Sequence, residues 1–258
     1  MASNPPGRCC TVGVKHEGEA VGEITQVANN PAYVSYPKDK STANAVLILP
    51  DVIGHEFINV QLIADQFAAN GYFVVIPDLF RGDPVPLNRP EGFDIMKWLQ
   101  GPPGHLPDTV DPIIIATIKE LREKHGVKKI GAVGYCFGGK YVARFLGATG
   151  VEAGATVDVG FTAHPSFVDE AELSAINGPL SIAAAETDSI FPAEKRHKSE
   201  EILAKIGKEK KIPYQVFLYS AVEHGFAVRA DLTDKRIKYA KEQAFSQAVA
   251  WFDEFLKD

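Results

Sequence analysis

The sequence has little of what marks several common classes of protein. It contains 3 cysteines among 258 residues. That is few, and an odd number cannot all pair, so the chain lacks the disulfide framework of a small secreted protein. No apolar run approaches the ~18 residues of a membrane-spanning helix, and the first residues lack the basic and apolar parts of a secretory signal. Basic residues number 27 against 33 acidic ones, a net charge of −6, which does not favour nucleic acid as a partner. These absences predict a globular cytoplasmic protein that binds neither membranes nor nucleic acid.

The chain is long enough to bury a large hydrophobic core. Hydrophobic residues make up 45% of it, and at about 150 residues per domain its length allows one large or two small domains. The sequence shows no internal repeat and no low-complexity tract. We therefore expect one domain over residues 1–258, with residues 1–30 as an N-terminal segment that wraps around it.

Short apolar segments of four to eight residues recur along the chain and predict strands. Many are apolar at both odd and even positions, which indicates burial on both faces and hence a parallel sheet covered by helices. The expected strands are 45–49, 73–76, 129–133, 155–162, 180–185 and 214–219.

The segments between these strands have helical periodicity. Apolar residues recur at helical spacing from Val60 to Phe67 and again over 245–256. Asp111 and Pro112 are expected to begin another helix as its N-cap and its first-turn proline. Alternation of strands and helices predicts an α/β fold, with a mostly parallel, doubly wound sheet and helices on both faces.

Residues 82–107 interrupt this alternation with six prolines around the apolar piece 93–99. The insertion follows the carboxyl end of a strand, where open α/β sheets bind their ligands. It is either a surface loop with one helical turn or a wall or lid over the site.

A strand runs directly into a helix at the sequence Gly134-Tyr-Cys136-Phe-Gly138. A nucleophile elbow has this arrangement, because a strained turn presents the nucleophile and small residues on either side let strand and helix pass closely. The N-terminus of the helix also favours a thiolate. The alternative is a cysteine buried for packing in a glycine-rich turn. Because the strand, the helix and suitable partners downstream are all present, we expect Cys136 to be a nucleophile.

A thiol nucleophile for acyl transfer needs a base, and the base needs a group to orient it. The elbow predicts the chain order nucleophile, acid, histidine, with the last two on loops after later strands. Asp188 follows the expected strand 180–185 and His224 follows 214–219. Asp188 has a rival in Glu186 and is otherwise a turn aspartate, and His224 is otherwise a surface histidine. None of the other six histidines follows the last strand, which favours His224 as the base.

These motifs are similar to those of the dienelactone hydrolase family of α/β-hydrolases. The likeness rests on the elbow 134–139, the acid loop 188–192, the turn His224-Gly-Phe, and the segments 50–54 and 76–81. It covers roughly residues 30–256. It implies a hydrolase like carboxymethylenebutenolidase, in which a Cys136–His224–Asp188 triad opens an enol-lactone or similar activated ester through a thioester. No metal or organic cofactor is implied.

The resemblance also implies roles for five further positions. The backbone N–H groups of Val52 and Phe137 would form the oxyanion hole. Asp51 stands where the family has a glutamate that keeps the resting thiol neutral, although an ordinary turn residue is the alternative. Arg81 and Arg229 would bind the carboxylate of a small-molecule substrate, the alternative being arginines in surface salt bridges.

Two rival functions stay open at this point. One is hydrolysis of a different ester, lactone or lactam on the same fold, with the insertion 82–107 reshaping the pocket. The other is a non-catalytic binding protein or thiol redox sensor that keeps the fold. Cys9 and Cys10 receive no role, and the sequence leaves the oligomeric state open.

Overall fold

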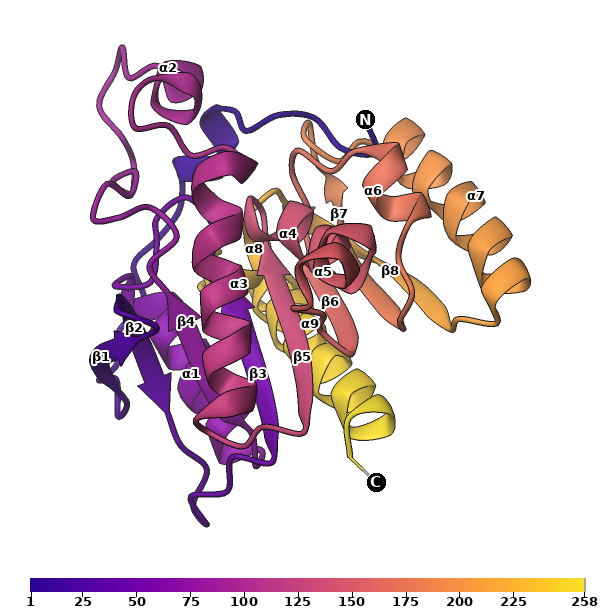
Figure 1. The fold of residues 1–258 in the computed structure, drawn as a ribbon. Helices are drawn as coiled ribbons and strands as arrows, with labels where there is room; N and C mark the ends of the chain where they lie inside the picture. Colours follow the sequence, from indigo (N-terminus) through magenta and orange to yellow (C-terminus); the bar gives the residue numbers. More distant parts are fainter. Residues whose placement is uncertain (258) are drawn as a thin grey trace.

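One mixed sheet of eight strands organises the chain in the computed structural model, which describes residues 1–257 (Figure 1). The strand order is β1-β2-β4-β3-β5-β6-β7-β8. β2 pairs antiparallel with both β1 and β4, and every pair from β4 to β8 is parallel. The strands are β1 (Glu23–Val27), β2 (Asn30–Ser35), β3 (Asn44–Leu49), β4 (Phe73–Pro77), β5 (Lys129–Tyr135), β6 (Val159–Ala163), β7 (Leu180–Thr187) and β8 (Tyr214–Glu223).

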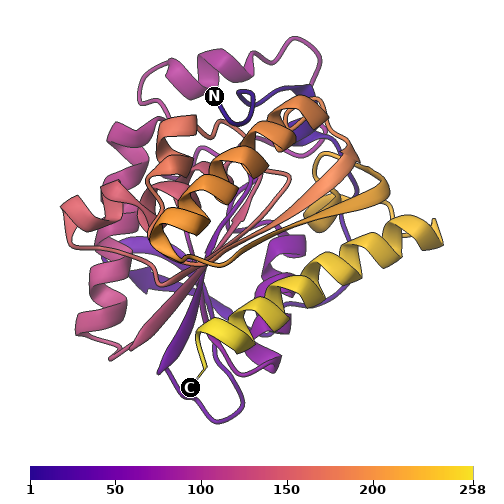
Figure 2. The same cartoon turned by 90° about the vertical axis from the view of Figure 1, so that its right-hand side faces the viewer.

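Helices cover both faces of the sheet (Figures 1 and 2). One face carries α1 (Ile58–Ala69), α8 (Phe226–Arg229) and α9 (Lys235–Phe255). The other face carries the remaining helices that pack on the sheet or on one another: α3 (Pro107–Glu123), α4 (Gly138–Leu146), α5 (Ala148–Ala153), α6 (Glu170–Ser174) and α7 (Ala193–Lys210). All residues of β4 and β6 are buried, as expected for strands covered on both sides. The predicted α/β fold is confirmed.

The structure corrects three details of the prediction. A hairpin of β1 and β2 adds an antiparallel edge that was not predicted. The strand expected at 155–162 begins only at Val159, after a loop. Helix α3 begins at Pro107, so Pro112 lies inside it rather than in its first turn. Proline suits the first helical position, where no N–H is needed. Pro107 occupies that position, about one turn before the predicted start of the helix.

The first residues of the chain pass across the carboxyl ends of the parallel strands (indigo in Figure 1). Ser3 donates its N–H to the carbonyl of Val168 at 3.1 Å, and Val14 donates to the carbonyl of Arg229 at 2.9 Å. Between these anchors lies the short 3₁₀ helix η1 (Arg8–Thr11). This segment therefore lies over the edge of the sheet where ligands of open α/β folds bind.

The insertion 82–107 meets the N-terminal segment above the same edge. It contains α2 (Ile95–Gln100), and the Trp98 ring lies with its centroid 6.3 Å from the ring of Phe137. Asn88 donates its N–H to the carbonyl of Thr11 at 2.7 Å. The insertion thus lies against the elbow on one side and against the N-terminal segment on the other.

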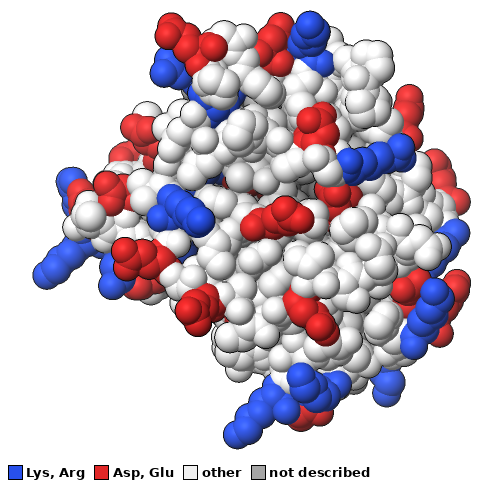
Figure 3. Space-filling model, turned by 90° about the vertical axis from the view of Figure 1, so that its left-hand side faces the viewer, with Lys and Arg blue, Asp and Glu red and all other residues white. Residues whose placement is uncertain are grey.

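Acidic and basic side chains are interspersed on the face shown in Figure 3, with no extended patch of one sign. Among residues 1–257, no helix combines the length and the apolar composition needed to cross a bilayer.

Candidate active site

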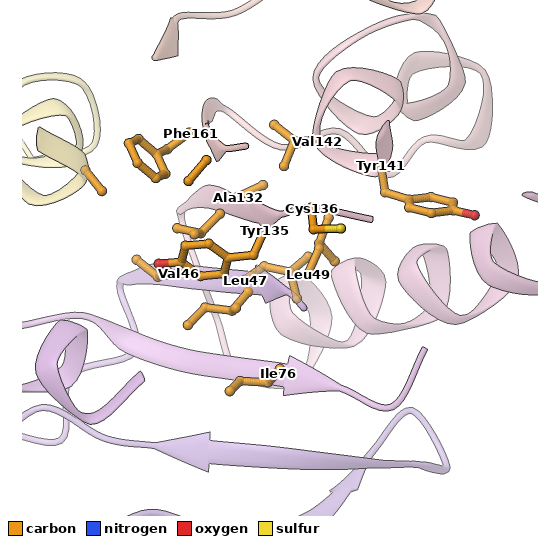
Figure 4. Packing of buried hydrophobic residues seen from close by; sticks show 14 of the residues in the cluster. Val46, Leu47, Leu49, Ile76, Ala132, Tyr135, Cys136, Tyr141, Val142 and Phe161 are labelled. Carbon is orange, nitrogen blue, oxygen red and sulfur yellow. The ribbon is translucent and has the colours of Figure 1, made fainter. Parts of the chain in front are cut away.

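Cys136 stands at the end of β5, where the chain turns sharply into α4. Its φ of +50° lies in the left-handed region, a strained conformation for a residue with a side chain. Its N–H donates to the carbonyl of Ala163 at 3.2 Å, and its carbonyl accepts from the N–H of Ser166 at 2.9 Å. Figure 4 shows the cysteine beside Leu49 at the edge of the packed core. The elbow is therefore held by the ends of β3 and β6.

The glycines of the elbow are needed because backbones touch there. A Cβ on Gly134 would lie 2.6 Å from the carbonyl oxygen of Gly138, and a Cβ on Gly138 would lie 1.9 Å from that of Leu49. Both distances are shorter than real Cβ contacts, so a side chain at either position would force the strand and helix apart.

Two hydrogen-bonding contacts connect the thiol of Cys136 to a carboxylate. The Nε2 atom of His224 lies 3.1 Å from Sγ of Cys136. On the other side of the ring, Nδ1 lies 3.0 and 2.9 Å from the two carboxylate oxygens of Asp188. The loop after β7 fixes Asp188, because Oδ1 also accepts the N–H groups of Ile190 and Phe191 at 2.8 and 3.0 Å. The structure thus brings together these three predicted residues.

Their electrostatics favour a thiolate beside an imidazolium. Burial alone raises the pKa of Cys136, but a hydrogen bond from Cys10 and the positive charge of His224 lower the pKa well below its usual value. Burial lowers the pKa of His224, whereas the Cys136 thiolate and the hydrogen bond to Asp188 raise it, to about 10. Both shifts act in the direction of a proton on the imidazole rather than on the sulfur.

Two backbone N–H groups next to the thiol have no acceptor among residues 1–257. They belong to Val52, in the turn after β3, and to Phe137, directly after the elbow. Unpaired backbone donors are rare in a protein interior. They are the same two groups for which the resemblance predicts binding of an oxyanion.

Asp51 and Arg229 form a buried ion pair beside the thiol. Nη1 of Arg229 donates to Oδ2 of Asp51, and both side chains are 1% exposed. Burial raises the pKa of Asp51, although the charge of Arg229 opposes that shift. The remaining guanidinium nitrogens donate to the carbonyls of Val12, at 3.0 Å, and Cys9, at 3.1 Å. Each nitrogen of Arg229 is therefore already engaged, two of them by the N-terminal segment.

Arg81, by contrast, is exposed, and its Nη2 donates to the carbonyl of Thr109 at 3.4 Å. Among residues 1–257 it forms no hydrogen bond or ion pair with the other predicted site residues. Glu186, the rival of Asp188, is also exposed and accepts the N–H of Ala221 rather than binding His224.

Two residues without a predicted role lie against the site. Sγ of Cys10 is 3.5 Å from Nε2 of His224, and the ring of His164 is centred 5.0 Å from that of His224. Burial, and then the positive charges of His224 and Arg229, lower the pKa of His164 well below its usual value. His164 follows the end of β6, a strand-end position that could have indicated it. Nothing in the sequence pattern points to Cys10.

The thiol is closed off from solvent in this conformation. Cys136 is 0% and His224 7% exposed. A cavity of about 430 Å³ lies next to η1, between the N-terminal segment and the insertion, and is lined by Arg8, Thr11, Val12 and residues 88–93.

Comparison with known proteins extends the assignment. The family model named Dienelactone hydrolase family matches residues 31–256. The chain is 55% identical to "Hydrolase pyvD" of Aspergillus violaceofuscus over 257 residues and to "Hydrolase tropI" of Talaromyces stipitatus over 263, covering all of each chain. A crystal structure described as a dienelactone hydrolase from Klebsiella pneumoniae shares the fold, with a TM-score of 0.70 at 17% identity over 91% of this chain and 99% of that one.

The family match begins in β2 and ends beyond α9, so it includes the elbow, the acid loop and the histidine turn. The chain belongs to the dienelactone hydrolase family and is an α/β-hydrolase that cleaves an ester or lactone.

Proposed function

We propose that this enzyme opens an enol-lactone, or a similarly activated small-molecule ester, through a thioester on Cys136, as a carboxymethylenebutenolidase does. The observation that supports this most is the continuous series of contacts from the Cys136 sulfur through His224 to Asp188, at 3.1 and 2.9 Å. A purely structural cysteine would need neither partner.

In the first step, the Cys136 thiolate attacks the carbonyl carbon of the lactone. The negative charge that develops on the carbonyl oxygen is bound by the N–H groups of Val52 and Phe137. Removal of one such donor from a comparable site costs about 3 to 4 kcal/mol of barrier. The free state of both amides supports this role, because neither has to break a hydrogen bond first.

Collapse of the tetrahedral intermediate breaks the ring C–O bond. The leaving enolate takes the proton of the His224 imidazolium, becomes an enol and tautomerises to a ketone that stays attached to the enzyme through the thioester. The neutral imidazole then accepts a proton from water, and the resulting hydroxide attacks the thioester carbonyl. Release of the acid restores the thiolate and the imidazolium, while Asp188 keeps Nδ1 protonated throughout.

We further propose that the substrate carries a carboxylate bound by Arg81 and Arg229. For Arg229, the carboxylate would take the place of Asp51 on the guanidinium, because every nitrogen already has an acceptor. In the resting enzyme, Asp51 would offset the charge of Arg229 that lowers the pKa of Cys136, which is the direction of the role that the resemblance implies, a carboxylate that disfavours the thiolate until substrate binds. The free cysteines fit a reducing compartment such as the cytoplasm.

Intact-mass spectrometry tests the proposal directly. Mixing the enzyme with a slowly hydrolysed activated ester should add one acyl group, located by peptide mapping on Cys136. Cys136→Ala should show no adduct and no turnover while keeping the circular dichroism spectrum of the parent. Cys9→Ala serves as the matched control and should form the adduct normally. Acylation at another residue, or a tenth of the parent turnover in Cys136→Ala, would refute the proposal.

A further inference from the structure

The Cys10 thiol lies among the proposed reacting groups, yet none of the proposed steps uses it. It comes from η1, far from the elbow in the sequence, and is fully buried. Its sulfur lies 3.5 Å from Nε2 of His224, and the Cys136 sulfur lies 3.1 Å from the same nitrogen. All three atoms lie within 4.8 Å of one another. Two sulfurs and one imidazole nitrogen thus form a small triangle inside the protein.

The dimensions of this triangle are close to those around a zinc ion. Zn–S bonds of ~2.3 Å and Zn–N bonds of ~2.05 Å at tetrahedral angles place two sulfurs about 3.8 Å apart and each sulfur about 3.6 Å from the nitrogen. The Cys10–His224 distance already matches, and the Cys136–His224 distance needs to grow by about 0.5 Å. A side-chain rotation can provide that change without moving the elbow.

The chemistry of the three groups also suits zinc. Thiolate sulfur and imidazole nitrogen are the ligands that this ion prefers. Zinc-binding histidines usually donate their other ring N–H to a carboxylate, which fixes the tautomer and orients the ring. Asp188 is already in that position, 2.9 Å from Nδ1. The ligand shell therefore has its supporting hydrogen bond before any metal binds.

Charge balance supports the same conclusion. Two thiolates and a neutral imidazole would neutralise the two positive charges of the ion, so the metal with its ligands would add no net charge to this buried region.

We propose that Cys10, Cys136 and His224 bind one Zn²⁺ ion, with water in the fourth position, and that binding reversibly switches off hydrolysis. Inhibition follows because the metal occupies both the nucleophile and the base. This site goes beyond the proposed function, since none of the proposed steps of ester cleavage forms a bond to Cys10 or moves its proton.

Cobalt(II) provides a spectroscopic test that does not depend on turnover. The full chain, reduced and freed of metal with a chelator, is titrated with Co²⁺ and then with Zn²⁺. We expect one equivalent of Co²⁺ to give tetrahedral d–d bands and a thiolate charge-transfer band with the intensity of two sulfurs. Zn²⁺ should displace it, inhibit hydrolysis stoichiometrically and be removed again by the chelator.

Cys10→Ser distinguishes this site from a simple thiol–metal contact at Cys136. We expect it to halve the charge-transfer intensity and to weaken Zn²⁺ binding at least about 100-fold. That is the upper end of the loss seen when a residue that only hydrogen-bonds to a metal ligand is removed. For each variant, inhibition by zinc is expressed relative to the rate of hydrolysis that the same variant shows in the presence of the chelator. Cys9→Ser is the matched control, because its sulfur contacts Ser189 instead, and it should bind both metals like the parent.

Two results would overturn the proposal: no thiolate charge-transfer band in the parent, or equal metal affinity in the parent and Cys10→Ser. A circular dichroism spectrum checks that Cys10→Ser is folded. If the variant is not folded, the intensity of the charge-transfer band of the parent decides whether one sulfur or two bind the metal. Failure of the hydrolase proposal would be seen separately, as the absence of an acyl adduct on Cys136.

Discussion

Replacement of Asp188 with asparagine changes one atom and tests whether the carboxylate holds His224 in its working tautomer. Oδ1 accepts two backbone N–H groups, from Ile190 and Phe191, so the amide oxygen of the variant will take that place. The amide nitrogen then replaces Oδ2, 2.9 Å from Nδ1 of His224. Because that nitrogen is a donor, Nδ1 must become an acceptor. The ring proton moves to Nε2, which faces Cys136 and can no longer accept a proton there.

The size of the effect follows from the nature of the nucleophile. The same change in a serine-based triad costs about 10⁴ in turnover. A thiol is intrinsically more nucleophilic and depends less on its base, and Cys136 keeps the hydrogen bond from Cys10 that lowers its pKa. We therefore expect Asp188→Asn to lower kcat about 10²-fold, equivalent to about 2.7 kcal/mol of barrier.

Steady-state hydrolysis of an activated ester measures this loss, with the concentration of competent enzyme taken from thiol titration. Glu186→Gln is the matched control: Glu186 is exposed and binds the N–H of Ala221 rather than His224, so its kcat should stay within about twofold of the parent. A larger loss in Glu186→Gln than in Asp188→Asn, or more than a tenth of the parent kcat in Asp188→Asn, would show that Asp188 is not the orienting acid.

Three further outcomes are expected. Arg81→Ala should lower kcat/KM about tenfold for a carboxylate-bearing lactone and leave kcat/KM for its neutral methyl ester almost unchanged. Tenfold is the lower end of the range for a charged hydrogen bond, because Arg81 is exposed. Equal losses on both substrates would show that Arg81 has a structural role. Asp51→Ala should lower the free energy of unfolding in urea by about 3 to 5 kcal/mol, because it leaves the buried charge of Arg229 unpaired; a loss below about 1 kcal/mol would contradict the buried ion pair. The pKa of Cys136 is lowered and that of His224 is raised to about 10. We therefore expect kcat/KM to fall at acidic pH, as the thiolate is protonated, and again near pH 10, as the imidazolium loses its proton. An acid limb centred near the ordinary pKa of a thiol would rule out a resting ion pair.

The sequence predicted the parallel part of the sheet because those strands are apolar throughout. β1 has no such pattern: of its five residues only Val27 is buried. Its turn to β2 uses Ala28 and Asn29 at positive φ, and alanine is not a residue that marks such a turn. An edge strand of this kind is fixed by its neighbours rather than by its own composition.

The elbow, the acid loop and the histidine turn could be located because each is a local motif next to a strand end. Cys10 could not, because its contact with His224 joins positions 214 residues apart. The roles of Arg81 and Arg229 came from the resemblance alone. The structure gives Arg229 the partner Asp51 and Arg81 a hydrogen bond to the carbonyl of Thr109, and the charge experiment above decides what Arg81 contributes.

The hydrogen bonds from Arg229 to the carbonyls of Val12 and Cys9 also bear on how the enzyme folds. They join positions 217 and 220 residues apart. Closing such a loop costs about 2.7 kcal/mol more in chain entropy than closing one of ten residues, and contacts of this range form late and slow folding. During synthesis, the carbonyls of Cys9 and Val12 are made early but lack these donors until residue 229 has been added. The enzyme therefore gains its finished site at the end of folding, and until then Cys9 and Cys10 are thiols without their native surroundings.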